Sequence, residues 1–190
     1  MIIMKQNRSI RNRKTITLTK IAVSVVFLVV SGWVAIPWIL PFTLQTLTVF
    51  LVIGLLGAAY SSVAIMVYLL LGIIGLPVFS GFQSGIGALI GPTGGFLLGF
   101  LLCAPISGWL VQRFAFRFQG VFLSYLLGLT VCYGFGLSWY VLVYQRQSAQ
   151  SWGAAAMCCV VPFLLPDLIK LFFATILTKR LRGILNQIGY

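Results

Sequence analysis

Long uninterrupted apolar stretches dominate this chain, and they constrain its fold more than any other feature. No charged residue lies between Lys20 and Arg113, and hydrophobic residues make up 61% of the sequence. Soluble domains carry roughly 25% charged residues, whereas this chain carries 7%. A transmembrane helix needs about 20 predominantly apolar residues. The sequence therefore predicts an all-α, multi-pass integral membrane protein.

Six apolar runs are candidates for transmembrane helices. Their expected limits are 19–37, 44–59, 60–76, 94–112, 120–143 and 154–178. The first run is too long for the apolar core of a signal peptide and has no convincing cleavage site, so we expect an uncleaved helix. The second and third runs are separated only by small residues from Gly57 onward. One long helix is an alternative there, but a turn between two helices is favoured. We expect a single six-helix transmembrane domain over residues 19–178.

Basic residues lie mainly outside the apolar runs, and their distribution predicts the orientation of the chain. They occur in segment 1–18 and at Lys20, in the connection around residues 113–117, and in segment 179–190. With the N-terminus inside, these groups share the cytoplasmic side and Arg146 is left alone outside, as the positive-inside rule favours. Segments 1–18 and 179–190 are thus expected to be basic cytoplasmic tails. The net charge of +12 does not indicate a nucleic-acid binder, because the charges form no basic face on a folded domain.

The segment 75–95 combines turn-forming residues with apolar ones. It predicts an irregular Gly-rich loop between the third and fourth helices, folded into the protein because backbone groups at membrane depth need partners. Glycines recur every four residues from Gly87 to Gly99. Glycines on one helix face allow either another helix or a ligand to approach the backbone closely. For Gly95 and Gly99, close helix packing is as good an explanation as a ligand. For residues 81–91 we expect a re-entrant or cavity-lining loop.

The inventory of reactive side chains excludes most catalytic chemistry. The chain has no His and a single acidic residue. Carboxylate-pair hydrolysis, a Ser-His-Asp triad and a His/carboxylate metal site are therefore excluded within it. It also lacks the GxxxxGK[ST] phosphate-binding loop of nucleotide-driven motors. We expect no enzyme activity, no metal and no cofactor.

Asp167 is the only acidic side chain, and Lys170 follows it three residues later. On a helix this spacing places the two side chains on one face. Placing a charged residue such as Asp or Lys near the centre of a bilayer costs about 2.5–3.5 kcal/mol on insertion scales. A charged residue inside a membrane span therefore usually marks a functional site. An interfacial pair at a helix start, with Pro166 in the first helical position, is an alternative. Thr43 and Gln45, near the start of the second expected helix, are further polar candidates.

Four ordered segments resemble the BioY family, the biotin-binding S components of energy-coupling-factor (ECF) transporters. They are PFTLQTL at 41–47, YLLLGIIGLPVF at 68–79, GPTGGFLLGF at 91–100 and PDLIK at 166–170. The resemblance implies a six-helix bundle in the bacterial cytoplasmic (inner) membrane that captures biotin from outside. It also implies a transmembrane T component and two cytoplasmic ATPase subunits as partners.

The resemblance also implies site residues. In the family, the acidic and basic residues after the last-helix proline contact biotin, and these positions are Asp167 and Lys170. Two further segments resemble substrate-covering parts, and their candidate residues are Thr43, Gln45, Gly91, Thr93 and Gly94. Because segment 75–95 has no basic residue, backbone N–H groups, polar side chains such as Ser80 and Thr93, or Lys170 must meet the carboxylate of biotin. Which end of biotin meets Asp167 stays open.

Three other functions remain open at this stage. The first is a proton-coupled solute carrier that uses Asp167 as a proton relay. The second is an S component for another vitamin, and the third is an assembly subunit with no ligand. A proton-coupled carrier works alone on a proton gradient, whereas an ECF component needs ATP-hydrolysing partners. An assembly subunit tolerates the loss of Asp167 in any small-molecule assay.

Overall fold

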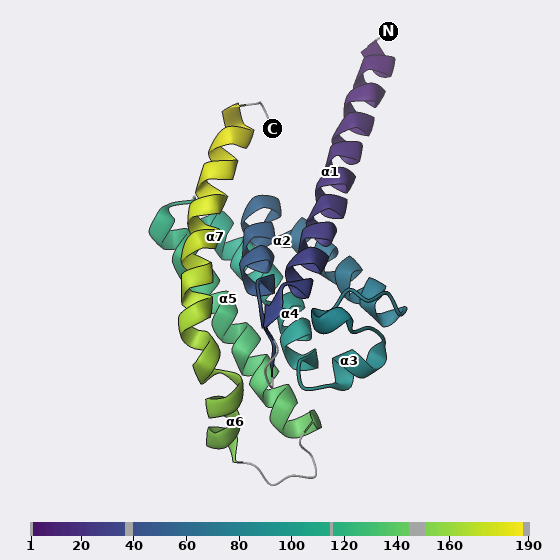
Figure 1. Ribbon diagram of the computed structural model, residues 1–190. Helices are drawn as coiled ribbons and strands as arrows, with labels where there is room; N and C mark the ends of the chain where they lie inside the picture. The colour runs from purple at the N-terminus through teal and green to yellow at the C-terminus, as the bar shows by residue number, and fades with distance from the viewer. Residues whose placement is uncertain (1, 37–39, 115, 145–150, 188–190) are drawn as a thin grey trace.

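The computed structural model describes residues 2–36, 40–114, 116–144 and 151–187, and its helices pack side by side as a bundle (Figure 1). Within these residues, five helical stretches are long and apolar enough to cross a membrane. They are Lys14–Trp33, Gln45–Ile73, Gly94–Arg113, Phe118–Tyr144 and Val161–Leu185. The predicted helical, multi-pass architecture is thereby confirmed.

Helix α1 (Ile2–Trp33) is longer at its start than the expected first span. It continues through residues 2–18, predicted as a tail, because no Gly or Pro interrupts the sequence before Gly32. After Trp33 the chain forms β1 (Ala35–Ile36), which pairs antiparallel with β2 (Phe42–Thr43). This two-stranded ribbon leads directly into the next helix.

Helix α2 (Gln45–Ile73) contains both the second and the third expected spans, and it folds back on itself at Gly57. Gly57 has φ +76° and ψ −179°, a conformation that glycine adopts without the steric cost of a side chain. The Gln45 side-chain amide donates to the Tyr68 hydroxyl at 2.9 Å. In a straight helix these residues would lie about 35 Å apart, since the rise is about 1.5 Å per residue. Residues 45–56 and 58–73 are therefore two helical halves that lie against each other.

The chain between α2 and α4 (Gly94–Arg113) contains only short helical turns. These are η1 (Ser80–Phe82) and α3 (Ile86–Ile90). The Trp33 indole N–H donates to the Pro77 carbonyl at 2.8 Å, and its ring stacks on Phe82 at a centroid distance of 5.1 Å. The end of α1 therefore holds this segment in place beside the bundle.

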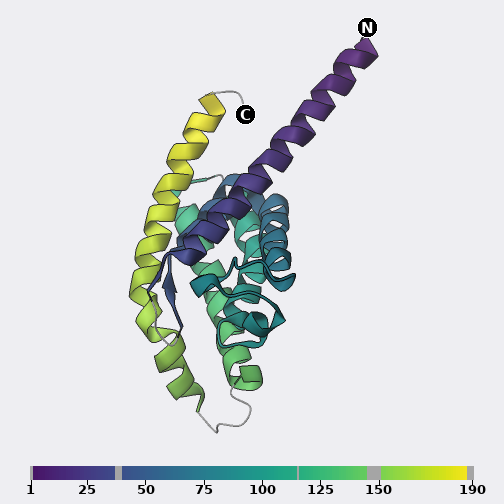
Figure 2. The same ribbon diagram turned by 45° about the vertical axis from the view of Figure 1, so that its right-hand side comes forward.

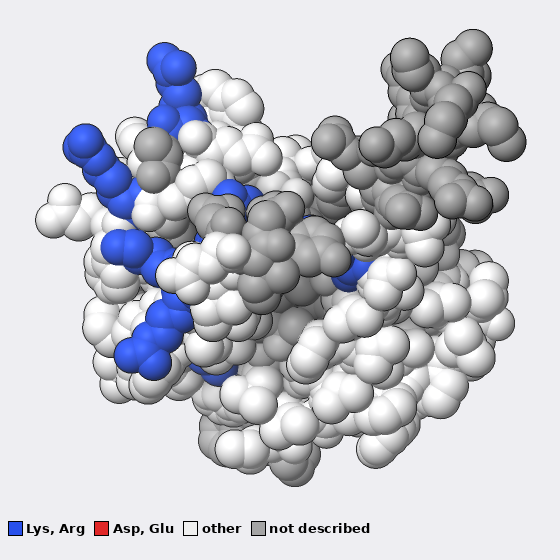
Figure 3. Space-filling model, turned by 90° about the horizontal axis from the view of Figure 1, so that it is seen from above, with Lys and Arg blue, Asp and Glu red and all other residues white. Residues whose placement is uncertain are grey.

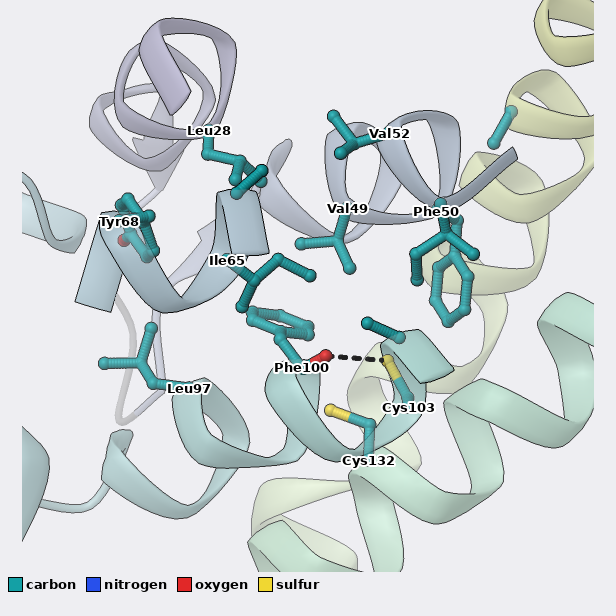
Figure 4. Packing of buried hydrophobic residues seen from close by; sticks show 14 of the residues in the cluster. Leu28, Val49, Phe50, Val52, Ile65, Tyr68, Leu97, Phe100, Cys103 and Cys132 are labelled. Atoms are coloured by element: carbon teal, nitrogen blue, oxygen red, sulfur yellow. Dashed lines mark hydrogen bonds between the residues drawn. The ribbon is translucent and has the colours of Figure 1, made fainter. Parts of the chain in front are cut away.

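Helices α4 and α5 (Phe118–Trp139) pack closely, and α5 continues as the π-helical turn η2 (Tyr140–Tyr144). A Cβ on Gly95 would overlap Trp139, and one on Gly99 would lie 3.0 Å from the Cys132 sulfur. Close helix packing therefore accounts for both glycines. The core between these helices and α2 includes Phe100, Cys103 and Cys132 (Figure 4).

The last expected span, 154–178, is divided into two helices. These are α6 (Trp152–Cys159) and α7 (Val161–Gln187), separated at Val160. Pro162 lies in the first turn of α7, where its missing N–H leaves no hydrogen bond unmade. Pro166 is inside α7 rather than at its start. The alternative that placed Pro166 in the first helical position is therefore wrong.

Both termini lie at one end of the bundle, and α6 lies at the other (Figures 1 and 2). At the end that carries the termini, Arg182 Nε of α7 donates to the Gly54 carbonyl at 2.7 Å, and its guanidinium lies 3.6 Å from the centroid of the Phe116 ring. This arrangement satisfies a carbonyl at the end of the first half of α2. Asp167, early in α7, lies toward the opposite end.

Candidate ligand-binding site

A cavity opens between the helix ends remote from the termini. Its empty space amounts to about 650 Å³, part of it open to the surroundings. Residues from the β2–α2 junction, η1, α4, α5 and α7 meet around it. Aromatic and aliphatic side chains form most of its wall, and polar side chains are few. They include Thr43, Gln45, Ser80, Thr93, Tyr133 and Asp167.

The Asp167 carboxylate is buried, with 4% of the residue exposed, and both of its oxygens are bonded. Lys170 Nζ donates to Oδ1 at 2.7 Å, and the Tyr133 hydroxyl donates to Oδ2 at 2.6 Å. An unpaired charge at this depth would be costly, so the two donors make the carboxylate tolerable inside the bundle. Each oxygen still has acceptor capacity left for a ligand N–H.

Lys170 stands behind Asp167 rather than in the cavity wall. Its side chain is 14% exposed, and it is not among the residues that line the cavity. The spacing of three residues does bring the two charges onto one face of α7, as the sequence predicted. In this structure Lys170 therefore acts on the cavity through the carboxylate that it pairs with.

Tyr133 is a functional candidate that sequence reasoning missed. It comes from α5, 34 residues before Asp167, and it both lines the cavity and bonds the carboxylate. Its ring also makes an edge contact with Phe96, at a centroid distance of 6.3 Å. A tyrosine in an apolar helix carries no local signal of this role, because only the packing of α5 on α7 brings the two groups together.

Gln45 and Thr43 both line the cavity, in agreement with their selection from the sequence. Gln45 is 3% exposed; its amide donates to the Tyr68 hydroxyl, which donates in turn to the Val78 carbonyl at 3.3 Å. The Thr43 hydroxyl oxygen accepts the Gln45 backbone N–H at 3.3 Å. These bonds hold the start of α2 against its own second half and against the segment before η1.

Ser80 and Thr93 contribute hydroxyl groups from the segment between α2 and α4. Among the buried side-chain polar atoms of the described residues, only Ser80 Oγ and Trp139 Nε1 have no hydrogen-bond partner. A buried hydroxyl without a partner costs free energy, so such an atom in a cavity wall indicates a place for a polar ligand group.

Gly91 and Gly94 do not line the cavity; they shape the turn that carries Thr93. The Gly94 N–H donates to the Gly91 carbonyl at 3.1 Å, and a Cβ on Gly94 would overlap the Leu89 carbonyl. Their contribution is therefore to backbone geometry. The structure thus brings together Asp167, Gln45, Thr43 and Thr93 around one cavity.

The chemistry of this cavity suits a small, largely apolar molecule with polar groups at separate positions. Phe79, Phe96 and Phe163 supply aromatic wall, and Phe163 is stacked on Phe42 at a centroid distance of 4.2 Å. Asp167 offers a charged acceptor for N–H donors. No group of three or more His, Cys, Asp or Glu side chains that could hold a metal occurs in the described part of the chain.

Comparison with known proteins identifies the family. A model of the BioY family matches residues 4–187. The chain belongs to the BioY family. The resemblance seen in its four sequence segments is thereby confirmed, and BioY proteins are transporter components rather than enzymes.

Two relatives within the BioY family match most of the chain. Biotin transporter BioY of Thermotoga maritima is 39% identical over 169 residues, which cover 87% of this chain and 95% of the relative. Biotin transporter BioY2 of Lactococcus lactis is 38% identical over 167 residues, covering 87% and 90%. The crystal structure of the S-component for biotin from an ECF-type ABC transporter superposes with a TM-score of 0.83 at 27% identity, covering 90% of this chain and 93% of that chain.

Proposed function

We propose that this chain is the S component of an ECF biotin transporter and that biotin binds in the cavity beside Asp167. Its similarity to biotin transporters over most of its length, and to the solved S component for biotin, supports this function. The observation that carries the site assignment is the buried Asp167 carboxylate, held by two donors at the wall of a mostly apolar cavity.

The ureido ring of biotin matches the Asp167 end of the cavity. That ring offers two N–H donors and one carbonyl acceptor, and a carboxylate with spare lone pairs accepts such N–H groups. Lys170 and Tyr133 hold the carboxylate in a fixed orientation before the ligand arrives. Less rotamer freedom is then lost on binding than with an unrestrained carboxylate.

The carboxylate of biotin needs a different partner, and Ser80 is our candidate. Its hydroxyl is buried in the cavity wall without a hydrogen-bond partner, and Thr93 lines the same cavity. The segment between α2 and α4 has no basic residue, so neutral donors must serve there. Gly91 and Gly94 support this end indirectly by shaping the turn before α4.

For the membrane arrangement we propose six crossings, with both termini in the cytoplasm of a bacterium and the cavity facing outside. The fold-back of α2 at Gly57 supports two crossings within one helical element. Both termini lie at one end of the bundle, and that end carries most of the basic residues (Figure 3). The proposed transmembrane domain keeps the limits 19–178, with the basic segments 1–18 and 179–190 on the cytoplasmic side.

Transport also requires an energy source. Because this chain has no nucleotide-binding loop, we propose that a transmembrane T component and two cytoplasmic ATPase subunits supply it. The similarity to an ECF S component supports this assignment. The alternative is a carrier that works alone on a proton gradient. Reconstitution of the isolated chain into vesicles tests this alternative.

Calorimetry of the purified chain in detergent tests the proposed function. Biotin is expected to bind saturably at one site, whereas riboflavin and thiamine give no heat beyond dilution. Binding of another vitamin in place of biotin would reassign the substrate. No binding by a folded sample, judged by a single symmetrical size-exclusion peak, would favour an assembly role.

A further inference from the structure

The wall of the cavity beside Asp167 carries no positive charge of its own. No Lys or Arg occurs among the described residues that line it. Lys170 is bonded to the Asp167 carboxylate at 2.7 Å and does not line the cavity. Figure 3 shows Lys and Arg side chains at the end of the bundle that carries the termini, remote from the cavity. An anionic ligand group in this cavity therefore meets no cation among the described residues of its wall.

The start of α4 does not replace the missing cation. Helix N-termini attract anions through free backbone N–H groups. Here the Gly94 N–H donates to the Gly91 carbonyl, and the Phe96 and Leu97 N–H groups both donate to the Thr93 carbonyl. These three N–H groups are already bonded. A ligand carboxylate therefore finds no cluster of free donors at these positions.

Hydroxyl groups are the polar groups that remain for the carboxylate end of the ligand. Ser80 Oγ is buried without a hydrogen-bond partner, and Thr93 lines the same cavity. A hydroxyl both donates and accepts hydrogen bonds, whereas a Lys or Arg side chain only donates. A carboxylate only accepts, while a primary amide accepts through its oxygen and donates through its nitrogen. These hydroxyls therefore suit either ligand group.

The negative charge of the ligand has two opposing effects on binding. A hydrogen bond to a carboxylate is stronger than one to a neutral amide. Removing water from an unpaired charge costs more free energy than removing it from an amide. The Asp167 carboxylate adds to that cost, because like charges repel. With no cation in the wall to offset the cost, we expect the charge to bring no large gain in affinity.

We propose that this site does not require the negative charge of the ligand, so that it binds biotinamide, the primary amide of biotin, as tightly as biotin. The inference rests on the proposed function and specifies its substrate class. That class is compounds with a ureido ring and a side chain that ends in either a carboxylate or a primary amide. Asp167 recognises the ring, and the Ser80 hydroxyl recognises the other end.

Calorimetry of the full chain in detergent, with biotin and with biotinamide, tests this proposal. The two dissociation constants of wild type are expected to agree within about threefold. Ser80→Ala removes a neutral hydrogen bond, so it should weaken binding of both ligands by a similar factor, roughly 2- to 10-fold. Ser138→Ala is the matched control, because the Ser138 hydroxyl donates to the Gly134 carbonyl of its own helix and does not line the cavity. Both affinities should be unchanged in that variant.

Other outcomes would overturn the proposal. If wild type binds biotin more than about tenfold tighter than biotinamide, a cation recognises the carboxylate. Loss of that preference in Arg146→Gln would assign the cation to Arg146, which lies outside the described residues. Weaker binding of biotin alone in Ser80→Ala, or no effect on either ligand, would contradict shared recognition by this hydroxyl. Failure of a folded sample to bind either ligand would instead refute the proposed function itself, so the two failures are distinguishable.

Discussion

Replacing Asp167 by Asn tests the candidate binding site most directly. The change keeps the size of the side chain and removes its charge, so one amide oxygen remains where two carboxylate oxygens accept bonds of 2.6 and 2.7 Å. Losing a hydrogen bond to a charged group costs about 1.5–3 kcal/mol. If the ureido N–H groups use this acceptor, Asp167→Asn should weaken biotin binding roughly 10- to 150-fold.

The same substitution leaves the Lys170 ammonium without its counter-ion. Breaking a fully buried pair costs about 3–5 kcal/mol, an upper limit here because the Lys170 side chain is 14% exposed. Lys170→Ala should likewise weaken biotin binding, since the carboxylate is then unpaired. The double variant Asp167→Asn with Lys170→Ala should lose less biotin-binding free energy than the sum of the losses in the two single variants.

Isothermal calorimetry with biotin, together with the melting temperature of each variant, measures these effects. Thr130→Val is a suitable control, because Thr130 is exposed on α5 and its hydroxyl bonds only the Leu126 carbonyl of its own helix. Its biotin affinity should match wild type. Dissociation constants within twofold of wild type for folded Asp167→Asn and Lys170→Ala would contradict a role in biotin binding and leave both residues as structural anchors.

Four further predictions follow from the same structure. Tyr133→Phe keeps the ring but removes its hydrogen bond to the carboxylate, so calorimetry should show biotin binding weakened about tenfold with little change in melting temperature; unchanged affinity would exclude a positioning role. Gly57→Ala should destabilise the fold by about 1–2 kcal/mol in thermal melts, because the turn has positive φ and a Cβ would overlap Gln112, whereas Gly134→Ala, in open space on α5, should be neutral or stabilising. Cysteines at Gln119 and at Ser148, which lies outside the described residues, should label from opposite sides of the membrane in a cysteine-free background; labelling of both from one side contradicts six crossings. The isolated chain should hydrolyse no ATP in a phosphate-release assay, and activity in a sample free of partner subunits would contradict the proposed division of labour.

The helical membrane fold and the main candidate for a site residue could both be predicted from the sequence. Span length and apolar composition are local properties, so the helical membrane architecture could be predicted without any contact. Asp167 stood out because it is the only acidic side chain, and the spacing to Lys170 predicted their shared face. The order of four short segments identified the family.

Which side chains lie next to one another became visible only in the three-dimensional structure. The sequence favoured a turn near Gly57 over one long helix, and the bond between Gln45 and Tyr68 shows that the two halves of α2 fold against each other. Tyr133 reaches Asp167 from a different helix, 34 residues away, and the unpartnered Ser80 hydroxyl faces the same cavity from a third segment. Hydrophobic patterns record which residues avoid water, but in a membrane nearly every residue does. Side-chain packing and hydrogen bonding therefore determine which helices lie next to each other. These contacts cannot be read from the hydrophobicity pattern of a single sequence.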